Sequence, residues 1–68
     1  MENKMTFGER LRAIRKEKGY KQGELAEKIG IDQNILSRYE LDVFQPSLSR
    51  LEWICGALEV TATELLGF

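Results

Sequence analysis

The stretch KQGELAEKIGIDQNILSRYE, Lys21 to Glu40, holds two short apolar patterns of helical period on either side of a glycine turn. The first pattern predicts a helix over Gln22 to Ile29, which stops at Gly30. The second predicts a helix over about Gln33 to Glu40, because Asp32 can cap its N-terminus. A short turn that contains glycine sets two helices at a steep angle. The stretch therefore predicts a pair of short, crossed helices at the centre of the fold.

A longer helix is predicted before this pair. Thr6 and Glu9 have the spacing of a capping box, in which each residue satisfies a backbone amide of the other. Apolar residues then recur at helical spacing until Gly19, which can end a helix in the left-handed conformation. These signals predict a helix over about Phe7 to Lys18.

Two more helices are predicted after the pair. Ser47 opens a fourth helix, and one apolar stripe of it is expected to face the core: Leu48, Leu51, Ile54, Cys55 and Leu58. Thr61 and Glu64 repeat the capping-box spacing before a last helix of one or two turns. No strand pattern, repeat or linker interrupts the series. The sequence predicts an all-α fold, a compact five-helix bundle in a single domain over residues 1–68 with a core over about 7–66.

Composition excludes several classes of protein. The chain has 68 residues, of which 43% are hydrophobic, so one domain near the lower size limit for a self-sufficient core is expected. It has no histidine and one cysteine, Cys55, so the usual zinc sites and histidine-dependent nucleophiles cannot be built within one chain. The sequence predicts no enzyme, no metal and no cofactor, with Cys55 buried and inert. The absence of a bilayer-length apolar run and of a signal-peptide pattern predicts a cytoplasmic protein with no membrane partner.

The net charge of −1 hides an uneven distribution. Residues 9–21 contain six basic and two acidic side chains, a balance of +4. Residues 22–68 contain three basic and eight acidic side chains, a balance of −5. The basic first helix is suited to face phosphate, and the alternative is an ordinary solvated helix surface.

The outward face of the helix over Gln33 to Glu40 carries side chains suited to DNA. Helical spacing turns Leu36 and Tyr39 toward the core. Glutamine and asparagine can bond adenine at two points, arginine can do so with guanine, and isoleucine suits a thymine methyl. The predicted base-reading residues are Gln33, Asn34, Ile35, Ser37 and Arg38. The alternative is a polar helix surface with no ligand.

Several motifs occur in register along the chain. They are Gln-x-x-Leu-Ala at 22–26, Gly30, Ser-Arg-Tyr-Glu at 37–40 and Pro-Ser at 46–47. This order resembles the helix-turn-helix of the Cro and phage-repressor class, also called xenobiotic-response-element-like regulators. The resemblance covers about Phe7 to Leu66 without gaps. It implies a five-helix domain that binds double-stranded DNA, usually as a dimer.

The resemblance also implies roles for single residues. The residue that matches Gln22 usually meets a phosphate, and those that match Gln33, Asn34 and Arg38 usually read base edges in the major groove. Lys21, next to Gln22, is predicted as a second phosphate contact.

An ion pair is predicted between the first and third helices. Glu40 lies on the core side of its helix, where a lone carboxylate is costly. Arg15 lies at the edge of the core-facing side of the first helix and can supply the partner. The resemblance implies the same pair. We expect it to set the angle of the recognition helix rather than to contact DNA.

The segment YELDVFQPS, Tyr39 to Ser47, departs from the family pattern. Proteins of this class commonly have a glycine two residues after the position of Glu40, followed by basic residues that bind phosphate. This chain has Asp42, Val43 and Phe44 instead. Asp42 is expected to adopt the left-handed turn and to repel DNA, and the two apolar residues offer phosphate only their backbone amides.

Exposed aromatic residues are predicted near this segment. Trp53 lies opposite the apolar stripe of the fourth helix and, with Phe44 and Phe68, can form an aromatic patch. Phe44 and Trp53 are therefore candidates for a dimer or partner surface. The alternative is that they fold back onto the small core as a satellite cluster.

Taken together, the patterns predict a sequence-specific DNA-binding transcriptional regulator, with repression as the expected mode. It is expected to bind a near-palindromic operator as a homodimer through the helix over residues 33–40. The alternative is an antitoxin or a regulator-modulating module that uses the same fold to bind a protein partner. The acidic balance after residue 21 and the exposed aromatic residues favour that alternative.

Overall fold

The computed structural model describes residues 5–67, which form five helices and no strand. The predicted all-α fold is confirmed, whereas the aromatic residue expected at position 68 lies outside the described residues. The helices are α1 (Phe7–Glu17), α2 (Gln22–Ile29), α3 (Gln33–Glu40), α4 (Leu48–Leu58) and α5 (Ala62–Leu66). None of them is long and apolar enough to cross a membrane.

Local chemistry explains where the helices begin and end. The Glu9 backbone amide donates to the Thr6 hydroxyl oxygen, and the Thr6 amide donates to the Glu9 carboxylate, so the predicted capping box is present at α1. α1 ends one residue earlier than predicted, because Lys18 is its C-cap. Gly30 ends α2 in the left-handed conformation with φ of 89°, which a side chain would disfavour. The predicted boundaries of α2 and α3 agree with the structure.

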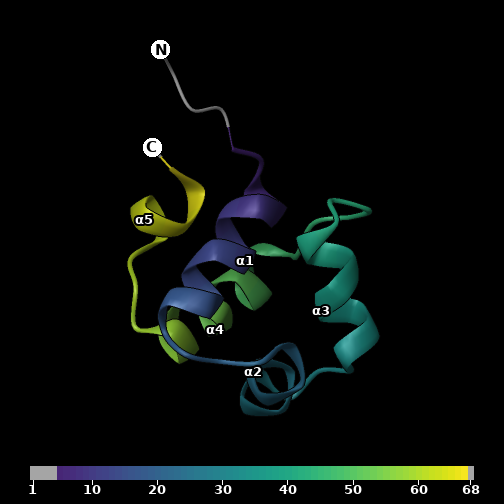
Figure 1. The fold of residues 1–68 in the computed structure, drawn as a ribbon. Coiled ribbons are helices and arrows are strands. Elements are labelled where there is room, and N and C mark those ends of the chain that lie inside the picture. Colours follow the sequence, from purple (N-terminus) through teal and green to yellow (C-terminus); the bar gives the residue numbers. More distant parts are fainter. Residues whose placement is uncertain (1–4, 68) are drawn as a thin grey trace.

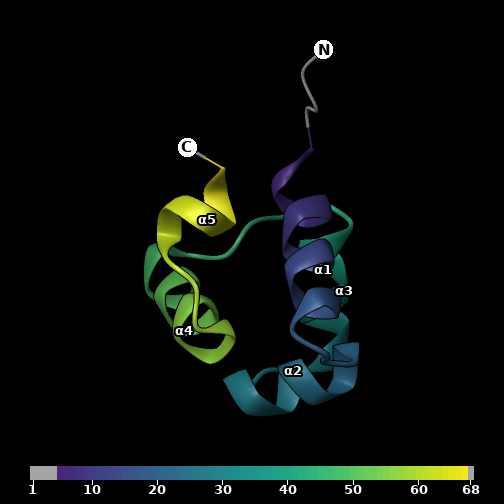
Figure 2. The same ribbon diagram turned by 60° about the vertical axis from the view of Figure 1, so that its left-hand side comes forward.

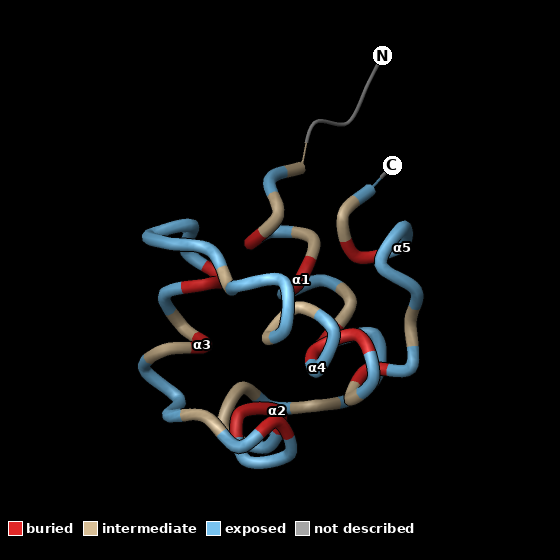
Figure 3. The backbone as a smooth tube through the Cα atoms, turned by 180° about the vertical axis from the view of Figure 1, so that it is seen from behind, coloured by how far each residue is buried: buried red, intermediate tan, exposed pale blue. Residues whose placement is uncertain are grey.

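Figure 1 shows α3 and α5 on opposite sides of α1, and Figure 2 shows α2 lying across one end of the bundle. α1 packs against both α3 and α5, while α2 packs against α3 and α4. Each helix contributes a buried segment, drawn in red in Figure 3. The fully buried large side chains are Leu11, Leu25, Leu36, Ile54, Leu58 and Leu65. The five elements thus share one core, and the outer face of α3 remains open.

One predicted core residue is exposed. Leu48 was expected on the buried stripe of α4, but it is 75% exposed. It is the first residue of the helix, and the following Ser49 is exposed as well, so the first turn of α4 is not covered by another element. Ile54 and Leu58 on the same stripe are buried as predicted.

A glycine permits the close approach of α1 and α3. Gly8 is buried in the first turn of α1. A Cβ at this position would lie 2.4 Å from the Glu40 carbonyl oxygen and 2.6 Å from that of Tyr39. Both atoms belong to the backbone, so they cannot move aside as a flexible side chain can. The end of α3 therefore rests directly on the start of α1.

Candidate nucleic-acid interface

The structure places the predicted base-reading residues on the open face of α3. Gln33, Asn34 and Arg38 are exposed, and Ser37 is half-buried. Ile35 differs from the expectation of an outward residue, because it is partly buried and packs against the core. Its position at the flank of the outward face, between the exposed and the buried side of α3, explains the partial burial. Three polar side chains and one hydroxyl thus remain available to a ligand.

The side chain of Gln33 is positioned by α2. Its amide Nε2 donates to Gln22 Oε1 at 3.2 Å, across the turn between the two helices. A Cβ at Gly23 would lie 3.1 Å from Gln33 Oε1, so the missing side chain at Gly23 leaves room for Gln33. The N-terminal entrance of α3 and the first turn of α2 therefore form one polar surface.

The predicted ion pair is present and buried. Arg15 Nε donates to Glu40 Oε2 at 2.6 Å, and Arg15 Nη2 donates to Glu40 Oε1 at 3.1 Å. Arg15 Nη1 also donates to the Tyr20 carbonyl oxygen at 2.9 Å. Arg15 and Glu40 are each 6% exposed. Such a two-point bridge fixes both the distance and the orientation between α1 and α3.

Gln22 extends this network to the open face of α3. Its Nε2 donates to Glu40 Oε1 at 3.1 Å, while its Oε1 accepts from Gln33. Arg15, Glu40, Gln22 and Gln33 are therefore joined in one continuous series of hydrogen bonds. Gln22 was predicted only as a phosphate contact. Its hydrogen bonds to Glu40 and Gln33 were not predicted, because they depend on the crossing angle of α2 and α3.

A hollow of about 700 Å³ lies between α1, α2 and α3. Lys21 and Ser37, both predicted for the interface, line it together with Arg12 of α1. Arg12 and Lys21 are exposed. Arg12 was predicted only as part of a basic helix. Its place beside Lys21 indicates that this part of the basic segment belongs to the same surface as α3.

The loop after α3 has a structural role that the sequence did not reveal. Asp42 adopts a left-handed conformation with φ of 61°, as expected. Its carboxylate accepts from the Gly8 backbone amide at 2.9 Å and from the Thr6 hydroxyl at 2.6 Å. Asp42 therefore caps the N-terminus of α1 from the loop after α3. The dipole of α1 favours a negative charge at this end of the helix. The Val43 amide donates to the Arg38 carbonyl oxygen, so it already has a partner.

Phe44 and Trp53 are connected through Tyr39 of α3 and Arg50 of α4. The Phe44 and Tyr39 rings meet edge to face with centroids 5.4 Å apart, and Phe44 is 41% exposed. Arg50 Nη1 donates to the Tyr39 hydroxyl at 3.3 Å, and the Arg50 guanidinium lies 5.7 Å from the centre of the Trp53 ring. Phe44 thus folds partly onto the core, whereas Trp53 stays 60% exposed.

Cys55 is buried, as the sequence predicted. Burial raises the pKa of the Cys55 thiol above its ordinary value, and the nearby charge of Glu52 raises it further. The thiol therefore stays protonated at neutral pH, and a protonated thiol is a poor nucleophile. Among residues 5–67 no three histidine, cysteine or acidic residues are grouped so that they can hold a metal ion.

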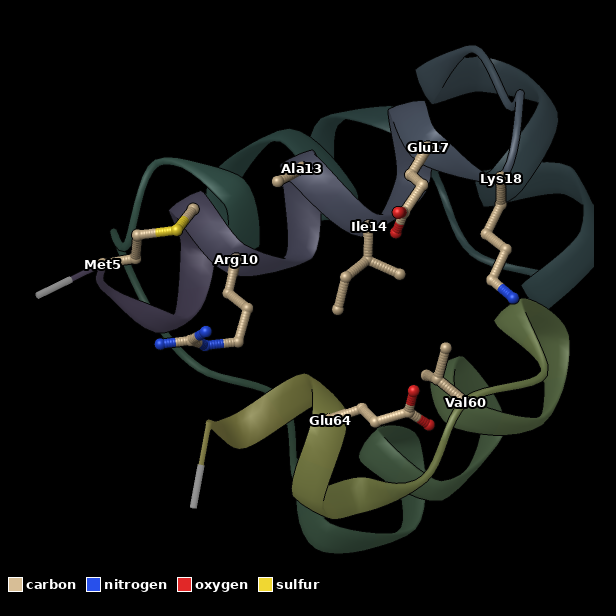
Figure 4. A pocket seen from close by; sticks show the side chains of 8 residues that line it. All are labelled: Met5, Arg10, Ala13, Ile14, Glu17, Lys18, Val60 and Glu64. Atoms are coloured by element: carbon tan, nitrogen blue, oxygen red, sulfur yellow. The ribbon is translucent and has the colours of Figure 1, made fainter. Parts of the chain in front are cut away.

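A second hollow lies on the other side of α1. Figure 4 shows it between α1 and α5, with apolar Met5, Ile14 and Val60 beside charged Arg10 and Lys18. Its volume is about 850 Å³. Because α3 lies on the opposite side of α1, this hollow is separate from the surface that carries Gln33 and Arg38.

The fold and the arrangement of this surface agree with a known family. A model of the helix-turn-helix family matches residues 11–65. The chain belongs to this family. The resemblance to Cro and phage repressors that rested on the motifs around Gly30 is thereby confirmed.

Individual relatives are similar over most of the chain. The immunity repressor protein of Bacillus phage phi105 is 43% identical over 63 residues, which cover 93% of this chain and 44% of that protein. The transcriptional regulator SinR of Bacillus subtilis is 42% identical over 61 residues, covering 88% of this chain and 55% of SinR. The chain therefore spans about half the length of the curated relatives it matches.

Solved structures of two such proteins superpose closely. The P22 c2 repressor in complex with a synthetic operator gives a TM-score of 0.85 at 28% identity, covering 93% of this chain and 96% of that one. SinR in complex with DNA gives a TM-score of 0.81 at 40% identity, covering 87% of this chain and 95% of that one. The phage-repressor type of five-helix bundle is thus confirmed.

Proposed function

We propose that this protein is a sequence-specific DNA-binding transcriptional repressor that inserts α3 into the major groove. The observation that carries the proposal is the exposed group of Gln33, Asn34 and Arg38 on the open face of the second helix of a helix-turn-helix. Relatives that are named as repressors and transcriptional regulators, and neighbours solved with operator or other DNA, support it. No enzymatic step forms part of this role.

Each exposed side chain of α3 has a chemical role in this proposal. Arg38 donates two hydrogen bonds to the O6 and N7 atoms of a guanine, while Asn34 bonds the N6 and N7 atoms of an adenine. Gln33 enters the groove with its amide already oriented by Gln22. A side chain that is held before binding loses less conformational entropy on contact.

Phosphate contacts set the register of α3 in the groove. Lys21 and Arg12 flank the hollow beside α3, and Gln22 lies at the first turn of α2. Cations at these positions neutralise phosphates and release counterions, which makes binding depend on salt. The Asp42 carboxylate accepts from the Gly8 amide in the first turn of α1, and the Glu9 carboxylate accepts from the Thr6 amide just before that turn, so both charges are partly compensated.

A homodimer on a near-palindromic operator completes the proposal. Two recognition helices about one turn of DNA apart read two half-sites, and the symmetry of the site reflects the symmetry of the protein. Selection of bound sequences from a random DNA pool at low salt tests this directly. We expect an enriched motif with two related halves. Failure to enrich any motif would exclude sequence-specific binding.

Arg38→Ala is expected to weaken operator binding roughly 5- to 150-fold, which corresponds to about 1–3 kcal/mol for one lost two-point base contact. The loss should also relax the preference at a single base position, because no other side chain reads that base. Binding measured on a panel of operators with single changes checks both effects. An equal loss for every sequence would instead assign Arg38 to phosphate.

Lys21→Ala and Arg12→Ala are expected to weaken all DNA sequences alike. Each should make the negative slope of log K against log salt shallower by about 0.9, the value for one phosphate contact. Lys16→Ala is the matched control, since Lys16 is an exposed cation of α1 that does not line the hollow. If the salt dependence is unchanged in the Arg12 variant, or becomes equally shallow in the Lys16 control, Arg12 does not belong to the interface.

A protein-binding role of the same fold has one specific observation in its favour. The segment from the end of α3 to the start of α4 exposes Leu41, Val43 and Leu48 by 71%, 63% and 75%. Neighbouring exposed apolar side chains are typical of protein interaction surfaces. Purification of the tagged chain from its native host separates the two roles. A stable heterologous partner that persists without DNA favours the protein-binding role.

A further inference from the structure

The outward face of α4 combines a large protruding side chain with an open space one turn away. Trp53 is 60% exposed. Gly56 is exposed on the same helix, and a Cβ added there would meet nothing within 4 Å. Residues three apart on a helix lie on the same face. Trp53 and Gly56 therefore form a protrusion and a recess side by side.

The recess belongs to a hollow between the C-terminal end of α2 and α4. Its volume is about 330 Å³, and its lining consists of Lys28, Ile29, Glu52, Trp53, Gly56 and Ala57. Ile29 and Ala57 give it apolar walls, while Lys28 and Glu52 contribute one charge of each sign. Balanced charge offers no net attraction to nucleic acid or to a strongly charged ligand. The hollow is suited to an aromatic side chain from a protein.

We propose that this hollow receives Trp53 of a second copy of the chain. In a two-fold interface the same patch must supply both partners of every contact. Trp53 and Gly56 are one turn apart, so two α4 helices that pair antiparallel bring Trp53 of each copy against Gly56 of the other. A patch with only a protrusion or only a recess would need a different protein as its partner.

Charge and size also favour a second copy. Lys28 and Glu52 contribute one charge of each sign to the lining of the hollow, so two identical hollows can meet without strong repulsion between these charges. A domain of 68 residues buries a smaller share of its surface than a larger one and gains from association. Phe44 borders this interface only indirectly, through Tyr39 and Arg50, and does not line the hollow.

This inference rests on the proposed function, because the proposed near-palindromic operator requires two recognition helices and therefore a dimer. Association is nevertheless measured without DNA. Failure of the dimer and failure of operator binding are therefore separate results.

Trp53 is the only tryptophan of the chain, so its fluorescence reports directly on the proposed contact. Sedimentation of the full chain over a range of concentrations gives the dimer dissociation constant. We expect the emission to shift to shorter wavelengths as dimer forms, because the ring leaves water. A dimer whose tryptophan emission does not change with concentration would overturn the proposal, as would a protein that stays monomeric.

Two variants test the pairing of Trp53 with Gly56. Trp53→Lys should weaken dimerisation roughly 30-fold or more, as expected for the loss of a central aromatic anchor. Gly56→Gln should weaken it as well, because the new side chain occupies the recess, while the open space around Gly56 allows the helix to form. Circular dichroism verifies that both variants remain helical.

Leu48→Lys is the matched control. Leu48 is another exposed apolar residue of α4, but it lies at the other end of the helix and does not line the hollow. Its replacement should leave the dissociation constant within about twofold of the wild type, since surface changes outside an interface have small effects. Equal weakening by Leu48→Lys, or normal dimerisation of Gly56→Gln, would contradict this register.

Discussion

Glu40→Ala is expected to destabilise the protein by about 3–5 kcal/mol, the usual cost of removing one partner from a buried ion pair. Arg15 is 6% exposed and would keep its charge without the carboxylate that now accepts two of its hydrogen bonds. Gln22 would lose its acceptor as well. A domain of this size has roughly 3–10 kcal/mol of stability in total. Urea denaturation should show a variant that is partly unfolded already in buffer.

A double variant separates the ion pair from simple loss of packing. Arg15→Met with Glu40→Leu removes both charges and keeps apolar volume, so it should recover most of the lost stability. Recovery should remain incomplete, because the Tyr20 carbonyl oxygen and the Gln22 amide each lose a partner. If Glu40→Ala costs less than 1 kcal/mol, or if the double variant is no more stable, the pair does not hold α1 and α3 together.

The double variant also predicts a functional effect. Gln22 connects Glu40 to Gln33, so removal of the carboxylate frees the amide that orients the entrance of α3. Operator binding should therefore stay weaker than that of the wild type even where the fold is restored. The ion pair would then affect DNA recognition only by positioning Gln22 and Gln33, without contacting DNA itself.

The helices could be predicted from the sequence because their signals are local. Capping residues such as Thr6 and glycines such as Gly30 act on neighbouring amides, so the boundaries of α2 and α3 follow from a few positions. The Arg15 and Glu40 pair was predictable for a related reason, since both residues interrupt apolar faces. The exposure of Gln33 and Arg38 follows from helical period once Leu36 is known to be buried.

The remaining features depend on how the helices approach each other. Asp42 caps α1 from 34 positions away, and nothing near it in the sequence indicates that partner. Ile35 was predicted at the flank of the outward face, and the structure packs it partly against the core. Leu48 was predicted to be buried but is exposed, because no other element covers the first turn of α4. Contacts of this kind are set by crossing angles, which short sequence patterns do not specify.

Gly8→Ala is expected to destabilise the protein by about 2–3 kcal/mol, toward the upper end for overpacking of a tight contact. The added methyl would lie 2.4 Å from the Glu40 carbonyl oxygen, so α1 and α3 must separate. This movement would also lengthen the hydrogen bond from the Gly8 amide to Asp42. The intrinsic gain of alanine over glycine in a helix, roughly 0.5–1 kcal/mol, is too small to compensate.

Gly56→Ala is the matched control, because Gly56 also lies within a helix but has open space where the Cβ would be. It should be neutral or more stable than the wild type by up to about 1 kcal/mol.

Thermal unfolding in dilute solution, where association contributes little, measures both effects. The unfolding midpoint of Gly8→Ala should be roughly 10–20 °C below that of the wild type, and that of Gly56→Ala should be unchanged or raised. Equal midpoints for the two variants would show that α1 and α3 are not in backbone contact at Gly8. Because α3 carries the proposed base-reading residues, a shift at this contact should also weaken operator binding, although Gly8 itself is buried in α1.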